Sequence, residues 1–414
     1  MVREAGTLDG RRVNRRRFLQ TGGSAALGVV AWSCAARSAP TAASAGTRRR
    51  PLVNLAPVDC SMDRVVRTTV GLRPHRDSGF LLRAERFDEK TVIHHVGHGG
   101  AGMSLSWGTA SLAADLALAH TERRAAVIGC GIIGLTSARQ LQRRGFDVTI
   151  YAMTVPPDTT SNLSLATFTP SSGLVSTGLR HPDWDQQYRR AVRIAFLEHQ
   201  LLAGPHYGVS WINEYRLLDA VPATPPRAPS YPLLDDLAPE VRLDSVLLMP
   251  GEHPFGTPYA TQHPTLRFEP SIYLDALMRD VHDSGGRIVI RAFDTPRDLM
   301  SLAEPLIVNC AGLGAKTLFG DEQLVPVKGQ LTVLEPQPEV TCMIEGMLPR
   351  SDGIVLNGAM QRRDEWGLEV DEAHQEWVVQ RYRTIFDAMR PPIPGVPFTR
   401  LDPHSTPTRS SARD

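Results

Sequence analysis

Apolar and polar positions along the chain follow both helical and strand periodicities. Apolar runs at 126–128 and 147–152 enclose a segment of helical periodicity that extends to about Arg144, where Gly145 is a typical C-terminal stop. Helical patterns also cover 107–120, 183–203, 271–284 and 372–389, and strand-like runs cover 91–96, 243–249, 287–290, 305–309, 327–334 and 353–357. The strand–helix–strand order predicts an α/β fold.

Length and composition narrow the class of protein. The chain has 414 residues, and single cores stop growing near ~250 to 300 residues, so we expect two domains. Its net charge of +1 argues against a nucleic-acid partner, because no large basic field is present. The cysteines Cys60, Cys130, Cys310 and Cys342 are widely spaced without a CxxC pair, which favours neither zinc binding nor a disulfide framework.

The N-terminus carries the parts of an export signal. Residues 14–20, NRRRFLQ, precede a short apolar run and an Ala-x-Ala site at 43–45, and this core resembles the twin-arginine type. We expect residues 1–45 to direct export through the twin-arginine machinery to the periplasm, cell surface or medium; a disordered basic tail is the alternative. Lipid attachment at Cys34 is not expected, because Trp32 fits that pattern poorly.

A glycine fingerprint joins the first strand to its helix. Gly129, Gly131 and Gly134 form GxGxxG, which allows a tight turn, close approach to a pyrophosphate and close helix–strand packing. The helix then begins with Ile132 and Ile133, and its N-terminus favours negative charge. The acid that usually binds the ribose, about 20 residues on, is replaced by Met153, and Asp158 is the nearest carboxylate downstream.

Several blocks together resemble the D-amino-acid oxidase and D-aspartate oxidase family. They are VIGCGIIGLTSA (127–138), VPPDTTSNLSL (155–165), LIVNCAGLGA (306–315), VPVKGQL (325–331), GLRPHR (71–76) and VIHHVGHGGAGMSLSWG (92–108). The resemblance covers most of residues 65–390. It implies FAD as cofactor, a glutathione-reductase-like Rossmann FAD-binding domain and a mixed-sheet substrate domain.

The order of these blocks differs from that of the family, in which GLRP and GHGG come last. The sequence therefore predicts a circular permutation, which is tolerable where chain termini lie close together on the surface. The expected organisation is a signal (1–45), a linker (46–65), the permuted segment (66–120), the Rossmann core (121–175), substrate-domain parts (176–266 and 331–390) around an FAD-domain return (267–330), and a disordered surface tail (391–414).

The resemblance also assigns the site residues. Arg73 would bind the substrate carboxylate, and a guanidinium suits this because it offers two parallel donors. The Gly100 carbonyl would face the substrate amine. The residues expected at FAD are Gly129, Gly131, Ile132, Ile133 and Gly134, Gly99, Gly100, Gly102, Met103 and Ser104, Thr159, Thr160 and Ser161, and Ala311 and Gly312. No metal is expected, because His94 and His95 alternate across a strand and His98 lies in a turn.

The implied reaction is oxidation of a D-amino acid to an imino acid, with oxygen or another acceptor reoxidising the flavin. The family's active-site tyrosines are missing from 341–353, where Met343, Glu345 and Met347 stand. Candidate substitutes are Tyr207, Tyr215, Trp211 and Trp366, and Arg350 is either a second cation for an acidic side chain or a surface residue. A glycine-, sarcosine- or proline-type oxidase and a flavin-binding protein without turnover remain alternatives.

Overall fold

The computed structural model describes residues 52–171, 179–223 and 232–401. The expected export signal with Cys34, and residues 402–414 of the expected tail, lie outside the described residues. Among the described residues, no helix combines the length and apolarity needed to cross a membrane.

A six-stranded sheet forms the first layer of the fold. Its order is β2 (Leu81–Phe87), β3 (Lys90–Val96), β10 (Leu306–Asn309), β4 (Arg124–Ile128), β5 (Asp147–Ala152) and β9 (Arg287–Ile290). The five strands from β3 to β9 run parallel, and β2 is antiparallel at one edge. The inner strands β10 and β4 are buried almost throughout, as expected for parallel strands covered on both faces.

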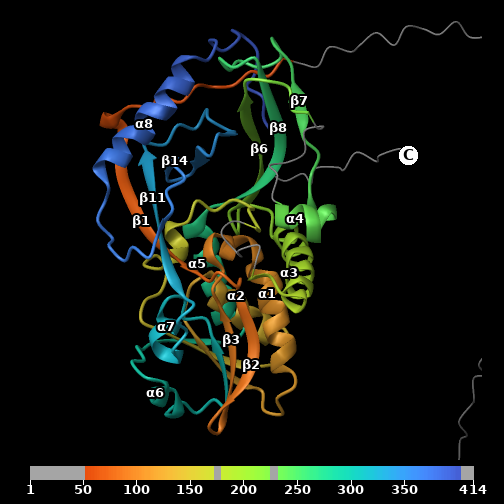
Figure 1. Cartoon of the computed structure of the whole chain (residues 1–414), viewed down its shortest axis with the longest axis vertical. Coiled ribbons are helices and arrows are strands. Elements are labelled where there is room, and N and C mark those ends of the chain that lie inside the picture. The colour runs from red at the N-terminus through yellow and green to blue at the C-terminus, as the bar shows by residue number, and fades with distance from the viewer. Residues whose placement is uncertain (1–51, 172–178, 224–231, 402–414) are drawn as a thin grey trace, which may run out of the picture. The chain divides into compact units, whose positions relative to one another are not determined.

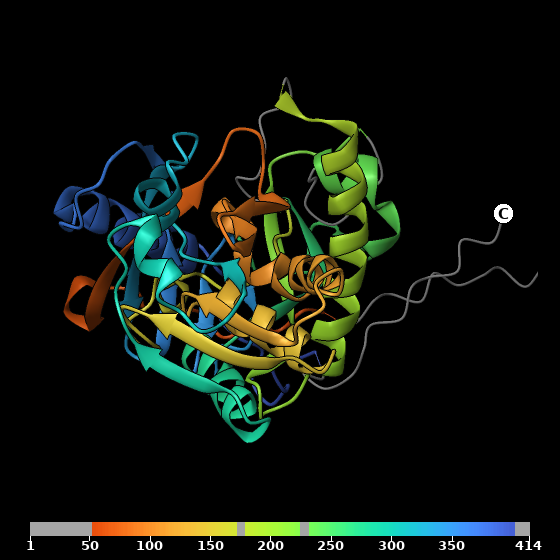
Figure 2. The ribbon, with the colours of Figure 1, turned by 90° about the horizontal axis from the view of Figure 1, so that it is seen from below.

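Helices cover both faces of this sheet. One face packs against α1 (Gly102–Ala117), α2 (Ile132–Gln142) and α5 (Pro270–Asp283), whose apolar side chains join those of β4 and β5 in the largest core cluster. The other face packs near α6 (Pro296–Met300) and α7 (Gly314–Phe319). The helix α3 (Pro182–Leu201) lies against α1, as Figures 1 and 2 show.

Two further sheets carry the remaining strands. The first contains β1 (Val65–His75), β11 (Val325–Leu334), β14 (Gly353–Asn357), β13 (Leu348–Arg350) and the short β15 (Arg362–Arg363). The second contains β12 (Met343–Ile344), β6 (Val209–Leu218), β8 (Tyr259–Phe268) and β7 (Val246–Leu248). Side chains from both sheets and from α8 (Glu372–Asp387) form a second core cluster. The short elements are η1 (Met62–Arg64), η2 (Gly99–Ala101), η3 (Thr160–Leu163), α4 (Pro232–Leu237) and η5 (Pro239–Val241).

Most elements expected from periodicity are confirmed: α1, α2, α3, α5 and α8, and the strands β3, β4, β5, β7, β9, β10, β11 and β14. The expectation omitted the long strands β1, β6 and β8. These strands place polar or charged residues at buried positions, such as Glu214 in β6 and His263 in β8, and β8 contains Pro264. The alternation of apolar and polar residues that identifies a strand is therefore hidden in these three strands, because other residues of the protein, and not water, satisfy the polar groups.

The expected linker (46–65) and surface tail (391–414) have different outcomes within the described residues: 391–401 are mostly exposed, as expected, whereas the start of the described chain is not a surface linker. Residues 52–60 lack regular structure, yet Val53, Leu55 and Val58 are buried in the second core cluster. Asn54 connects the two ends: its backbone N–H donates to Thr399 Oγ1 at 2.9 Å, and Thr399 N–H donates back to the Asn54 carbonyl at 2.7 Å. The segments are ordered because they satisfy each other's backbone groups.

Candidate active site

A cavity of about 670 Å³ lies where the parallel strands end. Its wall includes the residue that follows each of five strands: Gly97 after β3, Cys310 after β10, Gly129 after β4, Met153 after β5 and Arg291 after β9. Parallel strands bring their carboxyl ends to one edge of a sheet, which is the usual position of a nucleotide site in open α/β folds. The volume is within the range of small-molecule and cofactor sites.

The fingerprint glycines fit the expected FAD. Gly129 has φ +110°, and a Cβ there would lie 2.5 Å from the Cys310 carbonyl oxygen, so only glycine leaves this turn its close contact with the next strand. A Cβ at Gly134 would lie 1.9 Å from the Gly129 carbonyl oxygen. Gly134 therefore does not line the cavity; it lets α2 pack under the turn, whereas Gly131 lines the wall.

The N-terminus of α2 meets the hydroxyl loop at the cavity. Ile132, Ile133, Thr159, Thr160 and Ser161 all line it, as the resemblance implied. Ser161 Oγ accepts a hydrogen bond from Ile132 N–H at 2.9 Å, and Thr159 Oγ1 donates to Asn162 Oδ1 at 2.8 Å. The helix dipole and the hydroxyl groups make this wall suitable for a pyrophosphate.

The glycine loop after β3 continues the same wall. Gly99, Gly100, Gly102 and Met103 line the cavity, and Ala311 and Gly312 face it from the loop after β10. The assignment of Ser104 to the cofactor is wrong. Ser104 is buried, and its hydroxyl donates to the Thr167 carbonyl at 3.2 Å and accepts from Thr169 N–H at 2.8 Å.

The three histidines of this loop have separate hydrogen-bonding partners. His94 contacts Glu85 and Asn309 on one face of β3, whereas His95 contacts Ser137 and His98 contacts Thr109. Burial lowers the pKa of His98 to about 3 and lowers that of His95 well below its ordinary value. The described residues contain no cluster of three or more His, Cys, Asp or Glu side chains that could hold a metal.

Arg73 reaches the cavity from β1, at the point where β1 pairs with β11. Its Nη1 donates to the Met360 carbonyl at 3.3 Å, and the guanidinium lies so close to Gly329 that a Cβ there would be 2.6 Å from it. Burial lowers the pKa of Arg73, and no carboxylate of the described residues forms an ion pair with it. A half-buried guanidinium without a carboxylate partner favours an incoming anion.

Two ion pairs line the cavity near the second sheet. Arg216 pairs with Glu214 at 2.5 Å, and Arg381 of α8 lies 3.8 Å from Glu345. Burial raises the pKa of Glu214, but the hydrogen bond from His263 and the charge of Arg216 outweigh it, so the pKa lies below its ordinary value. Asn357 and Gln361 add amide groups to the same wall. No sequence motif marked these residues, because they come from separate elements.

The expected substitutes for the missing tyrosines are wrong. Tyr207 donates to Asp280 at 2.9 Å, Tyr215 is buried in the second core cluster, and Trp366 is 51% exposed. Met343 and Glu345 line the cavity, whereas Met347 is buried outside its wall. Arg350 does not line the cavity and its side chain is only 6% exposed, so neither interpretation of it is right. It pairs with Asp352 and donates to the carbonyl of Ser164, which is a residue of the cavity wall.

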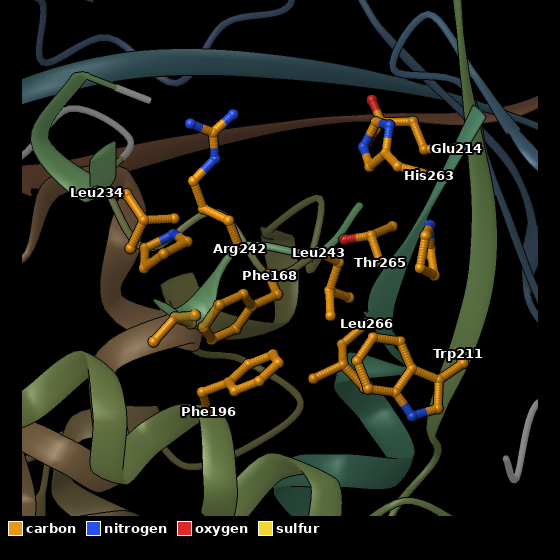
Figure 3. A pocket seen from close by; sticks show the side chains of 13 residues that line it. Phe168, Phe196, Trp211, Glu214, Leu234, Arg242, Leu243, His263, Thr265 and Leu266 are labelled. Atoms are coloured by element: carbon orange, nitrogen blue, oxygen red, sulfur yellow. The ribbon is translucent and has the colours of Figure 1, made fainter. Parts of the chain in front are cut away.

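A second pocket of about 40 Å³ lies beside the cavity and contains the other candidate, Trp211. Figure 3 shows Phe168, Phe196 and Trp211 at its apolar end and Glu214 with His263 at its polar end. Glu214 also lines the large cavity, so the Glu214–His263 pair, 3.1 Å apart, separates the two spaces. The pocket is too small for an amino-acid substrate.

More than half of the chain matches a known protein family. Residues 124–407 match the DAO family model, described as FAD dependent oxidoreductase. The chain is 28% identical to the D-amino-acid oxidase of Rubrobacter xylanophilus, covering 64% of this chain and 78% of that protein, and 25% identical to human D-aspartate oxidase, covering 62% and 74%. The solved glycine oxidase of Bacillus cereus ATCC 14579 is 16% identical with a TM-score of 0.45, covering 64% of this chain and 79% of that one. The chain belongs to the DAO family of FAD-dependent oxidoreductases, and its cofactor is FAD.

Proposed function

We propose that this oxidoreductase acts on D-amino acids. The observation that carries the proposal is Arg73, a half-buried guanidinium that lines the cavity without a carboxylate partner among the described residues. An α-carboxylate would supply the missing anion, and a bidentate contact would fix the orientation of the α-carbon. The relatives that act on D-amino acids by name support this substrate class.

The chain's own residues bind and orient the substrate. Arg73 holds the carboxylate, and the Gly97–Gly102 loop forms the adjacent wall of the cavity. When bound, FAD would supply the acceptor for a hydride from the substrate α-carbon, and the imino product would hydrolyse in water to a 2-oxo acid and ammonia. No general base is required if the amine binds in its neutral form, which agrees with a wall that places no Ser–His–Asp arrangement at this point among the described residues.

A second candidate is oxidation of glycine-type amines such as glycine, sarcosine or proline. The wall near Arg73 contains Met343 and Glu345 in place of the aromatic residues expected from the family, which favours this alternative. Both activities would use Arg73 in the same way, so they differ only in what the side-chain end of the cavity accepts.

Anaerobic reduction of the flavin separates these functions. Purified protein is mixed without oxygen with D-amino acids, their L-enantiomers, glycine, sarcosine or proline, and flavin absorbance is followed. Bleaching by D-amino acids but not by L-enantiomers is the expected result. Bleaching only by the glycine-type amines would assign the second function, and a flavin that none of them reduces would contradict both. Reoxidation by oxygen, measured as hydrogen peroxide, would distinguish an oxidase from a dehydrogenase.

We also propose that the chain is circularly permuted relative to its family. The family match begins at Arg124, yet residues 65–117 supply β1, β2, β3 and α1. The contact between Asn54 and Thr399 places the described ends side by side, as a permutation requires. A rearranged chain that begins near Arg124 and joins residue 401 to residue 52 through a short linker is expected to bind FAD; an unfolded product would contradict the proposal.

We further propose that residues 1–45 direct export through the twin-arginine pathway, on the basis of the Arg-Arg-x-Phe-Leu pattern alone. Replacing Arg15 and Arg16 with lysine in the full chain is expected to retain the protein in the cytoplasm. Export that is unchanged in this variant would contradict the proposal.

A further inference from the structure

The end of β5 is where a carboxylate usually binds the adenosine ribose of a dinucleotide. Here the position is occupied by Met153, whose side chain is 70% exposed and lines the cavity. A thioether is a weak acceptor and no donor, so it does not replace the carboxylate. The ribose hydroxyls therefore need another polar partner from the same edge of the sheet.

Arg291 lies directly beside this position. It follows β9, which pairs with β5, and its backbone N–H donates to the Ala152 carbonyl at 2.8 Å. The side chain lines the cavity, its guanidinium lies 4.8 Å from the ring centroid of Phe293, and Nη2 donates to Ser301 Oγ at 2.7 Å. These two contacts hold the guanidinium in place while leaving several of its five N–H groups for a ligand.

Arg291 makes no direct contact with a carboxylate among the described residues, although its charge reaches Asp298 and helps to lower the pKa of that carboxyl group. Among the described residues Arg291 forms no ion pair, and the nearby Glu304 accepts instead from Tyr151 Oη at 3.3 Å. Tyr151 in turn meets Phe293 edge-to-face with centroids 5.9 Å apart, and both rings line the cavity. The carboxyl ends of β5 and β9 thus present two aromatic rings, a thioether and one cationic donor.

We propose that Arg291 binds the adenosine ribose of FAD, donating hydrogen bonds to the hydroxyl oxygens that a carboxylate would otherwise accept from. Met153, Tyr151 and Phe293 provide the apolar surface on which the adenosine lies. The direction of hydrogen bonding is thereby reversed relative to the usual acidic residue, while the glycine turn and α2 keep their role at the pyrophosphate. This inference rests on the cofactor and not on the proposed substrate.

Affinity for two flavins tests the proposal without measuring activity. FMN contains the flavin and one phosphate but no adenosine. Protein stripped of flavin is titrated with FAD or FMN, and binding is followed by quenching of flavin fluorescence. Arg291→Ala is expected to weaken FAD binding about 10- to 100-fold, as for a lost hydrogen bond to a charged group, and to leave FMN binding unchanged. The FAD affinity of Arg291→Lys is expected to lie between those of the parent protein and Arg291→Ala, because lysine keeps the charge and loses the planar donor set.

Matched variants keep the test specific. Arg287→Ala removes a cation from the same strand, β9, but its side chain is 60% exposed, pairs with Asp147 and does not line the cavity, so FAD affinity should not change. Asp158→Asn tests the nearest carboxylate that lines the cavity and should also leave FAD affinity unchanged. The proposal is overturned if Arg291→Ala binds FAD like the parent protein, if it weakens FMN equally, or if Asp158→Asn alone produces the loss specific to FAD.

Discussion

The two ends of the cavity are built in different ways. At the nucleotide end, short glycine turns that directly follow parallel strands present backbone to the cavity at Gly97, Gly129 and Gly312. The substrate end consists of side chains from β1, β6, α8 and the loops around β12 and β14. The first end is specified by local motifs. The second depends on which distant elements pack together, and a change in one side chain can alter its chemistry without disturbing the fold.

The largest effect is expected at the nucleotide end from Gly134→Ala. The added Cβ would lie 1.9 Å from the Gly129 carbonyl oxygen, so α2 and the glycine turn cannot keep their positions. We expect purified protein with little or no FAD and a lower free energy of unfolding, measured from the flavin-to-protein absorbance ratio and by denaturation. Gly314→Ala is the control, because its Cβ would meet Ala311 at an ordinary 3.6 Å. Equal FAD content in the two variants would show that the turn is not as rigid as the contacts indicate.

At the substrate end, Arg73→Ala is expected to lower kcat/KM by about 100- to 1,000-fold while FAD stays bound. The physical reason is the loss of a charge-assisted, bidentate contact to the carboxylate. Arg73→Lys should recover only part of this loss, because an ammonium lacks the planar donor pair. Arg67→Ala is the control, since Arg67 is on the same strand but pairs with Asp352 at the surface. Loss of FAD from Arg73→Ala would mean that the residue supports the cofactor wall.

This difference explains how much could be predicted from the sequence. The turn at Gly129, the hydroxyl loop at Ser161 and the glycine loop at Gly100 were all identified, because each site residue lies within a few positions of its motif. Gly134 was expected at the cofactor and does not line the cavity, because it packs α2 against the glycine turn. Ser104 was assigned wrongly because it follows the same loop, but the start of α1 turns its hydroxyl towards Thr167 and Thr169.

The rest of the site has no local signal. Arg216 and Glu214 lie on β6, whose polar residues concealed the strand itself, and Arg381 lies on a helix more than 150 residues away. Arg291 reaches the cavity only because β9 pairs with β5. Tyr215 and Trp211, which were candidates to replace the missing tyrosines, are buried in the two main core clusters instead. Only the packing of distant elements determines which side chains meet at the substrate end and beside Met153 at the nucleotide end.

The Arg381–Glu345 pair allows the charge of the substrate end to be changed in both directions. Glu345→Gln keeps an acceptor for Leu217 N–H, which donates to Glu345 Oε1 at 2.6 Å, but leaves Arg381 without its carboxylate. Arg381→Met instead leaves the Glu345 carboxylate without its cation. D-aspartate and D-asparagine have similar shapes and differ in charge, so their ratio of kcat/KM reports the local potential. We expect this ratio to rise about three- to tenfold in Glu345→Gln and to fall by a similar factor in Arg381→Met.

Unchanged ratios in both variants would show that the substrate side chain does not reach this ion pair. A shift in the same direction in both would indicate a structural disturbance in place of an electrostatic effect. FAD content serves as the control for each protein, since the pair lies away from the glycine turns that hold the cofactor.

The smallest expected effect concerns His98, a buried histidine in the loop after β3. Burial lowers the pKa of His98 from 6.5 to about 3, so the folded protein keeps this histidine neutral while the unfolded chain takes up a proton below pH 6.5. His98 therefore costs no stability above pH 6.5, and the free energy of unfolding falls by about 1.4 kcal/mol per pH unit as the pH is lowered from 6.5 towards 3.

In His98→Gln the slope of the free energy of unfolding against pH, measured by urea unfolding between pH 6 and pH 4.5 with FAD present, should be shallower by about that amount. His282→Gln, whose side chain is 85% exposed, should keep the parent slope. The substrate end predicts no such dependence from Arg73, because a guanidinium remains charged throughout this range. If the slope in His98→Gln equals that of the parent protein, the loss of stability in acid comes from other groups, and the two ends of the cavity do not differ in their dependence on pH.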